Sequence, residues 1–354
     1  MKDFSGLQEI GSFFATPSAD LLLNEPQPLM WERSGVPTYV ETGRQALNAI
    51  ADDLLRNGIR QVVVPGYLCE SMLDPFLYNR FDVHFLRMTD DLQIDLNDLE
   101  KLDERALGGR YAVLMARYFG HERDLRYTVA ISRLQDFGVP VIEDLSHSLF
   151  DETASYADYT FASLRKLLPI ASGAVLTGVD SLASLNPSRD SVMDHVWGSM
   201  DAKKGYMEGL NPDRSFYPEF IAANRTLEET LDPHMIDGRS LSLLPLLPYS
   251  SFIDSRRRNY AFLLSRLADS HVVQVVNGTH MATASHLLIR TPNSTFVRQK
   301  LADARIYCPV HWPRPRGVPA TAAWGSDHFS IPIDHRYNEE ALEYVADCVK
   351  EICK

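Results

Sequence analysis

The chain has 354 residues, of which 45% are hydrophobic and 23% are charged, and its formal net charge is -12. This length and composition are typical of a globular protein with one large and one smaller domain. The negative charge disfavours nucleic acid or an anionic membrane as the main partner, because both attract basic surfaces. The run Arg256-Arg257-Arg258 is basic, but its helical context predicts a solvated face, so an anionic ligand would need a local basic pocket.

The cysteines and the apolar segments predict a reduced, cytoplasmic protein. The four cysteines, Cys69, Cys308, Cys348 and Cys353, form no CxxC pair and no metal-ligand spacing. The first residues lack the basic start and the apolar run of a signal peptide. The most apolar stretch, Leu167 to Val179, is too short to span a bilayer.

Helices alternate with short buried strands from about residue 43 to residue 180. The first clear helix is predicted over Gly43–Arg56, where apolar residues fall on one face, and a second is predicted over Leu125–Phe137. Apolar runs predict buried strands at Val62–Pro65, Tyr111–Ala116, Val139–Ile142, Tyr159–Ala162 and Ala174–Thr177. This alternation predicts an α/β layer with a mostly parallel sheet.

The sequence pattern changes after about residue 230, which predicts a smaller α+β unit. Helices are predicted over Ile253–Leu267 and Asn338–Lys350, and strands over Val272–Val276 and Leu287–Arg290. We therefore divide the chain into a large α/β domain at residues 41–240 and a small C-terminal domain at residues 241–354. Residues 1–40 carry few periodic signals and are expected to pack on the small domain or on a dimer partner.

Two residues at and after the end of a predicted strand could carry chemistry. Parallel sheets bind ligands at the carboxyl ends of their strands, and Asp144 lies where the apolar run around Ile142 ends. A carboxylate there could face the protonated ring nitrogen of pyridoxal phosphate (PLP) and keep the ring electron-withdrawing. The alternative for Asp144 is a helix N-cap. His147 could lie beside the phenolic oxygen of the ring, although a single histidine is more often structural.

Lys166 is the candidate residue for a covalent bond to this cofactor. Its apolar neighbours on both sides predict partial desolvation, which would lower the pKa of the amine and let it attack an aldehyde. A predicted strand separates Lys166 from Asp144, and this spacing makes the pair more informative than either residue alone.

Five further residues could hold the cofactor. Thr42, Gly43 and Arg44 stand at the start of the first helix, where free N–H groups and the helix dipole favour a phosphate. Thr42 can equally be only an N-cap. Ser163 precedes Lys166 by three residues and could reach the same phosphate. Tyr67 follows a strand and could either stack on the pyridine ring or pack in the core.

Other catalytic motifs fit less well. Ser163-x-x-Lys166 also matches the Ser-x-x-Lys of serine acyl-enzymes, but their Ser-Asp-Asn and Lys-Thr-Gly tripeptides do not occur in the sequence. The sequence has no G-x-S-x-G, G-x-G-x-x-G, Walker or H-E-x-x-H motif. The histidines at positions 280, 286, 311, 328 and 335 show no zinc-ligand spacing, so no metal site is predicted.

Together these segments resemble the DegT-like family of sugar aminotransferases, within the fold-type-I PLP enzymes. The resemblance runs from about residue 40 to the C-terminus and depends on the order and spacing of several motifs. These motifs are Thr42–Leu47, Val63–Cys69, Arg117–Gly120, Val141–His147, Ser163–Pro169 with Ser172-Gly173, Tyr307–Pro313 and Ser330–Ile333. The implied fold is a large domain with a seven-stranded, mostly parallel sheet flanked by helices, and a smaller C-terminal α+β domain.

The resemblance assigns roles to single residues. Lys166 is similar to the lysine that holds PLP as a Schiff base, and Asp144 to the carboxylate that pairs with the ring nitrogen. His147 matches the position that approaches the ring oxygen. The backbone around Gly43 and Arg44 resembles the phosphate-binding turn.

The sequence also departs from the family's pattern. The aromatic residue that stacks on the ring aligns nearer Cys69 than Tyr67, so either could face the cofactor. The family's Gly-Tyr-Asn motif, whose asparagine reaches the phosphate of the partner subunit, is absent, and Asp237-Gly-Arg-Ser240 lies roughly there. Cys308 stands where a basic residue often precedes the proline of the C-terminal motif.

The predicted function is that of a PLP-dependent aminotransferase, which moves an amino group from a glutamate-like donor to a keto-sugar nucleotide or a related carbonyl substrate. The resemblance also implies a homodimer with the active site at the subunit interface. Arg117, Tyr118, His311 and His335 are candidate substrate contacts, although His311 can also simply pack against Trp312. Two alternatives stay open: a PLP enzyme acting on an amino acid or small ketone, such as a decarboxylase or racemase, and a non-catalytic binding protein with the same fold.

Overall fold

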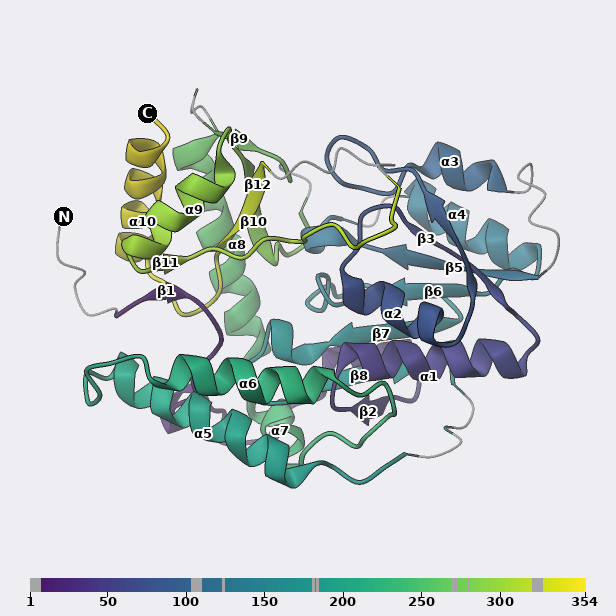
Figure 1. Ribbon diagram of the computed structural model, residues 1–354, viewed down its shortest axis with the longest axis horizontal. Helices are drawn as coiled ribbons and strands as arrows, with labels where there is room; N and C mark the ends of the chain where they lie inside the picture. The colour runs from purple at the N-terminus through teal and green to yellow at the C-terminus, as the bar shows by residue number, and fades with distance from the viewer. Residues whose placement is uncertain are drawn as a thin grey trace.

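The computed structural model of the protein describes residues 8–102, 110–122, 125–179, 182, 185–268, 271, 273–278, 281–319 and 327–354. Figure 1 shows a large sheet with its helices in one part of the molecule and a smaller group of strands and helices in the other. In the described residues the large sheet has seven strands: β2 (Thr38–Val40), β3 (Gln61–Pro65), β4 (Asp82–Leu86), β5 (Tyr111–Ala116), β6 (Val141–Asp144), β7 (Tyr159–Ser163) and β8 (Ala174–Thr177).

Helices α1 to α4 connect strands of this sheet, and α5 to α7 follow its last strand in the chain. The α-helices are α1 (Gly43–Arg56), α2 (Glu70–Tyr78), α3 (Leu96–Glu100), α4 (Leu125–Asp136), α5 (Asp190–Met207), α6 (Phe216–Glu228) and α7 (Gly238–Leu243). Short 3-10 helices are η1 (Ala19–Leu21), η2 (Met30–Ser34), η4 (Tyr118–Gly120), η5 (Leu164–Lys166) and η6 (Leu244–Leu246).

The strand order of the sheet is β2-β8-β7-β6-β5-β3-β4. The five strands from β7 to β4 pair in parallel, and β8 pairs antiparallel with both of its neighbours. Crossovers between parallel strands are right-handed. The face that a helix covers therefore depends on the direction in which it connects one strand to the next across the sheet. In agreement, α1 packs on α2 and α3 packs on α4. The topology confirms the predicted seven-stranded, mostly parallel α/β fold.

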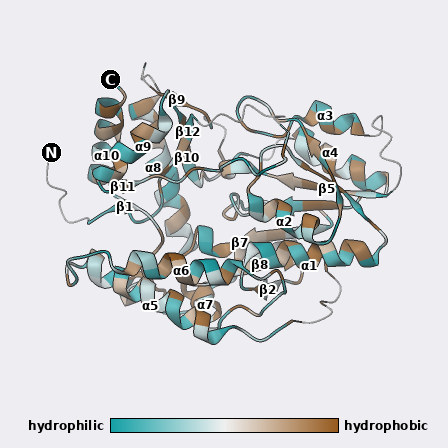
Figure 2. Cartoon of the chain, in the orientation of Figure 1, coloured by the Kyte–Doolittle hydropathy of each residue, from teal (hydrophilic) through white to brown (hydrophobic). Residues whose placement is uncertain are grey.

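Several elements lie where the sequence predicts them. α1, β5 and β8 have the predicted bounds, and α4 ends one residue before the predicted Phe137. The start of α1 is fixed by Thr42, whose side-chain oxygen accepts a hydrogen bond from the Gln45 N–H at 3.2 Å. The central strands β5 and β6 are buried almost throughout, and Figure 2 shows the hydrophobic residues of β5. This burial is why their sequences are continuous apolar runs.

The smaller body is built around an antiparallel sheet with the strand order β12-β10-β9. Its elements are β9 (Gln274–Val275), β10 (His286–Arg290), α9 (Ser294–Asp303), β11 (Ile306–Tyr307), β12 (His328–Pro332) and α10 (Glu339–Ile352). The predicted first strand residue, Val272, lies outside the described residues. The predicted α+β character of this part of the chain is present, and the exact domain limits at residues 40 and 240 stay predictions.

One long helix, α8 (Tyr249–Leu267), connects the two bodies. Its first half packs Phe252 and Ile253 into a cluster with residues of the large body, such as Leu164. Its second half packs Leu263 and Leu267 into the core of the smaller body. The middle of α8 therefore lies where the two cores meet.

The N-terminal segment also joins the two parts of the molecule. Its short strand β1 (Ile10–Gly11) pairs in parallel with β11 of the smaller body. The buried carboxylate of Glu9 lies 2.7 Å from Lys203 Nζ on α5 and 2.7 Å from Arg214 Nε. Within the described residues, every helix is too short or too polar to cross a membrane.

Candidate active site

The carboxyl ends of β6 and β7 bring the central candidates to one edge of the sheet. Asp144 is the last residue of β6, and β7 leads into η5, which ends at Lys166. Asp144 is in register with Phe161 on β7, two residues before Ser163. The sheet edge that binds ligands in parallel α/β folds therefore carries Asp144, Ser163 and Lys166 together.

Asp144 is a buried carboxyl group. Its residue is 7% exposed, and its Oδ1 accepts a hydrogen bond from the Ser146 N–H at 2.8 Å. Burial raises the pKa of Asp144, and the positive charge of Lys166 opposes this rise. The alternative that Asp144 caps a helix is wrong, because residues 145–158 form turns and bends. The carboxyl group is thus placed to accept a hydrogen bond from a cationic N–H.

Lys166 lies on the wall of a cavity of about 530 Å³ that both bodies of the molecule line. The lysine is exposed, whereas its neighbours Leu164 and Leu167 are buried in the core. The prediction that apolar neighbours desolvate Lys166 is therefore wrong, because the chain turns the lysine toward the cavity and the leucines away from it. An accessible amine can react with an aldehyde that enters the cavity.

The N-terminus of α1 lies against Ser163. A Cβ on Gly43 would stand 3.1 Å from the Ser163 Cβ, so a glycine permits this close approach. The first N–H groups of a helix have no acceptor within it, and those of Gly43 and Arg44 have none among the described residues. The Thr42 hydroxyl is used as the N-cap, and the Arg44 guanidinium turns to Asp74 at 3.3 Å. An anion at this helix end would therefore be bound by the backbone N–H groups of Gly43 and Arg44 rather than by the side chains of Thr42 and Arg44.

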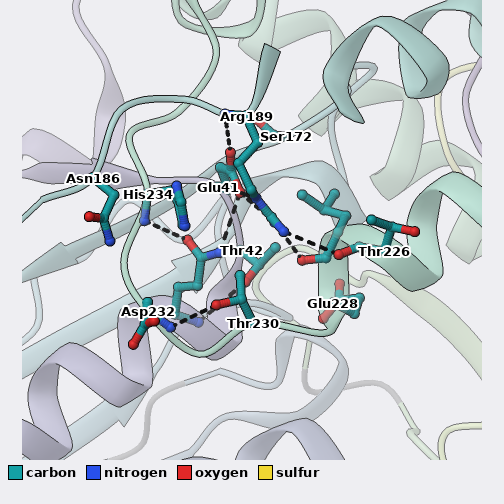
Figure 3. Close-up of polar contacts among 12 residues, drawn as sticks. Glu41, Thr42, Ser172, Asn186, Arg189, Thr226, Glu228, Thr230, Asp232 and His234 are labelled. Atoms are coloured by element: carbon teal, nitrogen blue, oxygen red, sulfur yellow. Dashed lines mark hydrogen bonds and ion pairs between the residues drawn. The ribbon is translucent and has the colours of Figure 1, made fainter. Parts of the chain in front are cut away.

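A buried ion pair holds the residue that precedes this helix end. Glu41 is fully buried, and its Oε2 accepts hydrogen bonds from Arg189 Nη2 at 2.6 Å and Nε at 2.8 Å. Figure 3 shows Arg189 directed at Glu41 in this network. His234 is tied to α1 by its N–H, which donates to Gln45 Oε1 at 3.0 Å. Arg189 balances the charge of the Glu41 carboxylate and so helps to hold the start of α1 in place.

The space beside Asp144 is bordered by His147, Lys166 and Trp312. The Trp312 ring stacks on His147 with a centroid distance of 5.2 Å and an interplanar angle of 28°. Burial, followed by the charge of Lys166, lowers the pKa of His147 well below its usual value, so the imidazole is neutral. Trp312, expected from the sequence only as a packing partner of His311, therefore also borders the space beside Asp144.

Tyr67 and Cys69, the two candidates for a stacking contact with the ring, lie outside the linings of this space and of the large cavity. Tyr67 is fully buried, and its hydroxyl oxygen lies 3.0 Å from Nε2 of His328. The Cys69 sulfur lies 2.9 Å from the Ser71 hydroxyl at the start of α2. Their contact with a cofactor stays a prediction.

Two of the predicted substrate contacts are occupied by other partners. Arg117 is buried, and its Nε lies 3.3 Å from the Glu143 carboxylate, while its Nη1 pairs with Asp151. The charge of Arg117 is therefore already balanced, which speaks against a role in substrate binding. Tyr118 borders the space beside Asp144, but its hydroxyl donates a hydrogen bond to the backbone carbonyl of Tyr67.

The two predicted histidine contacts differ in position. The His311 ring lies 5.2 Å from that of His147, and its Nδ1 is 2.7 Å from the Ser330 hydroxyl. The His335 ring stacks on Phe252 at 3.7 Å and on Phe14 at 5.7 Å. Both histidines lie outside the linings of the two cavities, and the stacking of His335 on Phe252 and Phe14 is a packing contact.

The segment that stands in place of the Gly-Tyr-Asn motif begins α7. Asp237 accepts hydrogen bonds from the Ser240 N–H at 2.9 Å, the Trp197 indole N–H at 3.0 Å and the Ser172 hydroxyl at 2.6 Å. These bonds hold the segment against α5 and the residues after η5 of the same chain.

The large cavity is also lined by Arg256, which the sequence predicted to lie on a solvated face. Arg256 is 2% exposed and lines the cavity, whereas Arg257 and Arg258 are exposed. The prediction of a solvated face is therefore wrong for Arg256. Three consecutive residues on a helix span about 200° around its axis, which was a signal that one of the three arginines faces inward.

No family model matches the sequence, and no curated protein is similar to it in sequence. Solved structures match its fold over most of the chain. The sugar aminotransferase CalS13 from Micromonospora echinospora is 17% identical, with a TM-score of 0.62, over 97% of this chain and 99% of that chain. Spr1654 from Streptococcus pneumoniae, in its PLP-form, is 13% identical, with a TM-score of 0.65, over 97% and 98% of the two chains. A DegT DnrJ EryC1 StrS aminotransferase from Brucella abortus is 14% identical, with a TM-score of 0.61, over 91% and 87%. These matches confirm the predicted fold, and at these identities the likeness concerns the fold alone.

Proposed function

We propose that the protein is a PLP-dependent aminotransferase that moves an amino group from a glutamate-like donor to a keto-sugar nucleotide or a related carbonyl compound. The observation that carries the proposal is the placement of the buried Asp144 and the accessible amine of Lys166 at one sheet edge, beside the free N-terminus of α1. The fold shared with the sugar aminotransferase CalS13 supports the substrate class. A homodimer with a shared active site belongs to the same proposal and rests on the family resemblance. A cytoplasmic location belongs to it as well and rests on the cysteine pattern and the apolar segments of the sequence.

The residues at this edge fit the polar groups of PLP. The N–H groups of Gly43 and Arg44, with the Ser163 hydroxyl beside them, suit the phosphate, and Gly43 leaves the room that a larger residue would fill. The raised pKa of Asp144 shows a buried carboxyl group that would gain from a cationic partner such as the ring N–H. Lys166 is free to bond to the aldehyde carbon. When bound, PLP supplies an electron sink for the pair left behind by proton loss.

The chain's own residues position the reactants and move protons. The Asp144 carboxylate holds a proton on the ring nitrogen through a charge-assisted hydrogen bond. The Lys166 amine would serve as the general base and acid that moves a proton between the substrate carbon and the cofactor carbon. Neutral His147 can donate a hydrogen bond beside the ring oxygen without adding charge, and Trp312 covers its imidazole.

The first test is covalent attachment of PLP to Lys166. We expect the purified protein, supplied with PLP, to show a near-visible absorbance band, and borohydride to fix the cofactor on the peptide that contains Lys166. Lys166→Ala should lose the band and all turnover, because the other described lysines lie outside the cavity lining. Lys300→Ala, which changes a half-exposed lysine on α9, is the matched control and should keep both. A fully active Lys166→Ala enzyme would contradict the proposal.

A second measurement separates transamination from the other PLP reactions. Adding glutamate without a carbonyl acceptor should remove the absorbance band, and adding 2-oxoglutarate should restore it. A decarboxylase or racemase would leave the band largely unchanged under these conditions. A protein that shows no band with PLP would be a binding protein with this fold rather than an enzyme of this class.

A further inference from the structure

The large cavity is cationic although the protein is acidic. Among the described residues that line it, five are cationic and two carry a carboxylate: Arg165, Lys166, Arg256, Arg298 and Arg336 against Glu228 and Asp334. The whole chain, by contrast, has a formal net charge of -12. A cavity whose charge opposes that of its protein concentrates anions, because the surrounding low-dielectric walls focus its field.

Both carboxylates of the cavity are already paired. Arg165 Nη2 lies 2.6 Å from the Glu228 carboxylate, and Arg336 Nε lies 2.7 Å from that of Asp334. Arg336 also donates to backbone carbonyls of the N-terminal segment, including that of Gly11. These two pairs are therefore structural. The positive charge that is left over belongs to Lys166, Arg256 and Arg298.

Arg256 is the buried member of this set. It lies in the middle of α8, where the two cores meet, and its residue is 2% exposed. Its Nη1 donates one hydrogen bond, to the Ser285 carbonyl at 2.8 Å, and its Nε has no acceptor among the described residues. No carboxylate of the described chain forms an ion pair with it at 4.0 Å or less.

Burial of a guanidinium without a carboxylate is unfavourable, so its retention calls for an explanation. A structural contact with the Ser285 carbonyl needs a single N–H donor, whereas Arg256 has five donors in a planar fork. That fork matches the two oxygens of a carboxylate or a phosphate. Burial lowers the pKa of Arg256 to about 10, which leaves it charged at neutral pH.

The position of Arg256 relative to Lys166 fits substrate binding. Both residues line the same cavity, together with His286. The pKa of His286 is lowered to about 3, chiefly by burial and then by the charges of Arg256 and, more weakly, Lys166. The neutral His286 imidazole therefore lies within the field of both cations and does not compete with them for an anion.

We propose that Arg256 binds an oxyanion group of the substrate, a carboxylate or a phosphate, in the cavity that Arg256 and Lys166 both line. The identification of this anion as part of the substrate rests on the proposed aminotransferase function. The binding of the anion itself does not depend on that function. The carboxylate would come from the amino donor and the phosphate from the nucleotide of the acceptor.

The experiment measures anion binding to the PLP-loaded protein by calorimetric titration. The probes are glutarate, a dicarboxylate without an amino group, and inorganic pyrophosphate, and the one that binds identifies the source of the oxyanion. We expect Arg256→Met to weaken binding at least tenfold and Arg256→Lys to weaken it less. Arg258→Gln, on the exposed side of the same helix, is the matched control and should bind as the wild type does.

Thermal unfolding of the same variants separates binding from a structural role. Arg256→Met removes a buried charge without a carboxylate partner, but it also removes the hydrogen bond to the Ser285 carbonyl and the contact with the Phe150 ring. Because these effects oppose one another, the variant should unfold close to the wild-type temperature. If the Met variant does not fold, Arg256→Lys supplies the binding comparison.

Two results would overturn the assignment. They are wild-type affinity for the probe in a folded Arg256 variant, and failure of both probes to bind the wild-type protein. PLP loading on Lys166 is recorded in each sample, so failure of the proposed function appears as missing cofactor and is distinct from failure of anion binding.

Discussion

At the scale of single residues, the buried carboxyl group of Asp144 lowers the stability of the fold but is suited to pair with the ring nitrogen of PLP. Its carboxyl group is buried, and burial raises its pKa. A group whose folded-state pKa lies above its unfolded value destabilises the fold once the pH exceeds the unfolded pKa. Retaining an ionisable group here is explained if a cationic ring N–H pairs with it.

Asp144→Asn tests this use. The amide cannot hold the ring nitrogen protonated, so the rate of glutamate-dependent loss of the absorbance band should fall by about 10²–10⁴-fold. Without cofactor the variant should unfold at the wild-type temperature or above it, because a destabilising buried carboxyl group has been removed. Stopped-flow absorbance and thermal unfolding measure the two effects. A variant with the wild-type rate would show that Asp144 does not face the ring nitrogen.

The identities of Asp144 and Lys166 could be predicted from the sequence, but the directions of long side chains could not. Lys166 lies in an apolar stretch and yet turns to the cavity, since η5 places it between two buried leucines. Arg256 lies in a basic run and yet turns inward. In both cases the direction depends on how the helix sits on distant parts of the fold, which local composition does not record.

At the scale of elements, the position of the α1 N-terminus depends on the Glu41–Arg189 pair. Arg189→Met would leave the Glu41 carboxylate buried without its partner, and losing one member of a buried pair costs about 3–5 kcal/mol of unfolding free energy. Arg225→Met is the matched control, because its pair with Glu229 is exposed and is worth about 0–1 kcal/mol.

Chemical denaturation of the two variants measures the difference. PLP affinity should fall in the Arg189 variant as well, because the backbone N–H groups of Gly43 and Arg44 belong to the second and third residues after Glu41. Equal unfolding free energies for the two variants would mean that Arg189 does not compensate the buried carboxylate.

Elements with one clear pattern could be predicted, and elements with mixed patterns could not. α1 has a regular apolar face, and β5 is a continuous apolar run, so both have the expected bounds. α2 contains Pro75, which normally interrupts a helix, and β4 is an edge strand with partly exposed residues. The helical hairpin of α5 and α6 was missed as well, because its apolar residues pack locally on the N-terminal segment rather than on the sheet.

At the scale of the whole molecule, the charge of the cavity could not be predicted. The cationic residues that line it come from η5, the middle of α8, α9 and the connection between β12 and α10. Only the folded arrangement shows that, among the described residues, Arg165 and Arg336 form ion pairs with carboxylates while Arg256 forms none within 4.0 Å. A total charge of -12 therefore says little about the charge of a site.

A last prediction concerns the contact that joins the N-terminal segment to α5. Lys203 is buried, and burial, together with the charge of Arg336, lowers its pKa from 10.5 to about 8 even though Glu9 opposes the change. Between pH 8 and pH 10.5 the unfolded chain therefore binds more protons at this lysine than the folded protein does. Unfolding free energy attributable to Lys203 should rise with pH in this window, by up to ~1.4 kcal/mol for each pH unit.

Comparison with Lys203→Met isolates this effect from other groups that titrate in the same range. The methionine leaves the Glu9 carboxylate paired with Arg214 through Oε2, and the Phe13 carbonyl still accepts a hydrogen bond from Arg336 at 3.2 Å, so neither residue loses all of its partners. Denaturation at pH 7.5 and pH 10 should show the wild type gaining stability relative to the variant. Parallel pH profiles would mean that Lys203 titrates normally and that the segment is held by its other contacts alone.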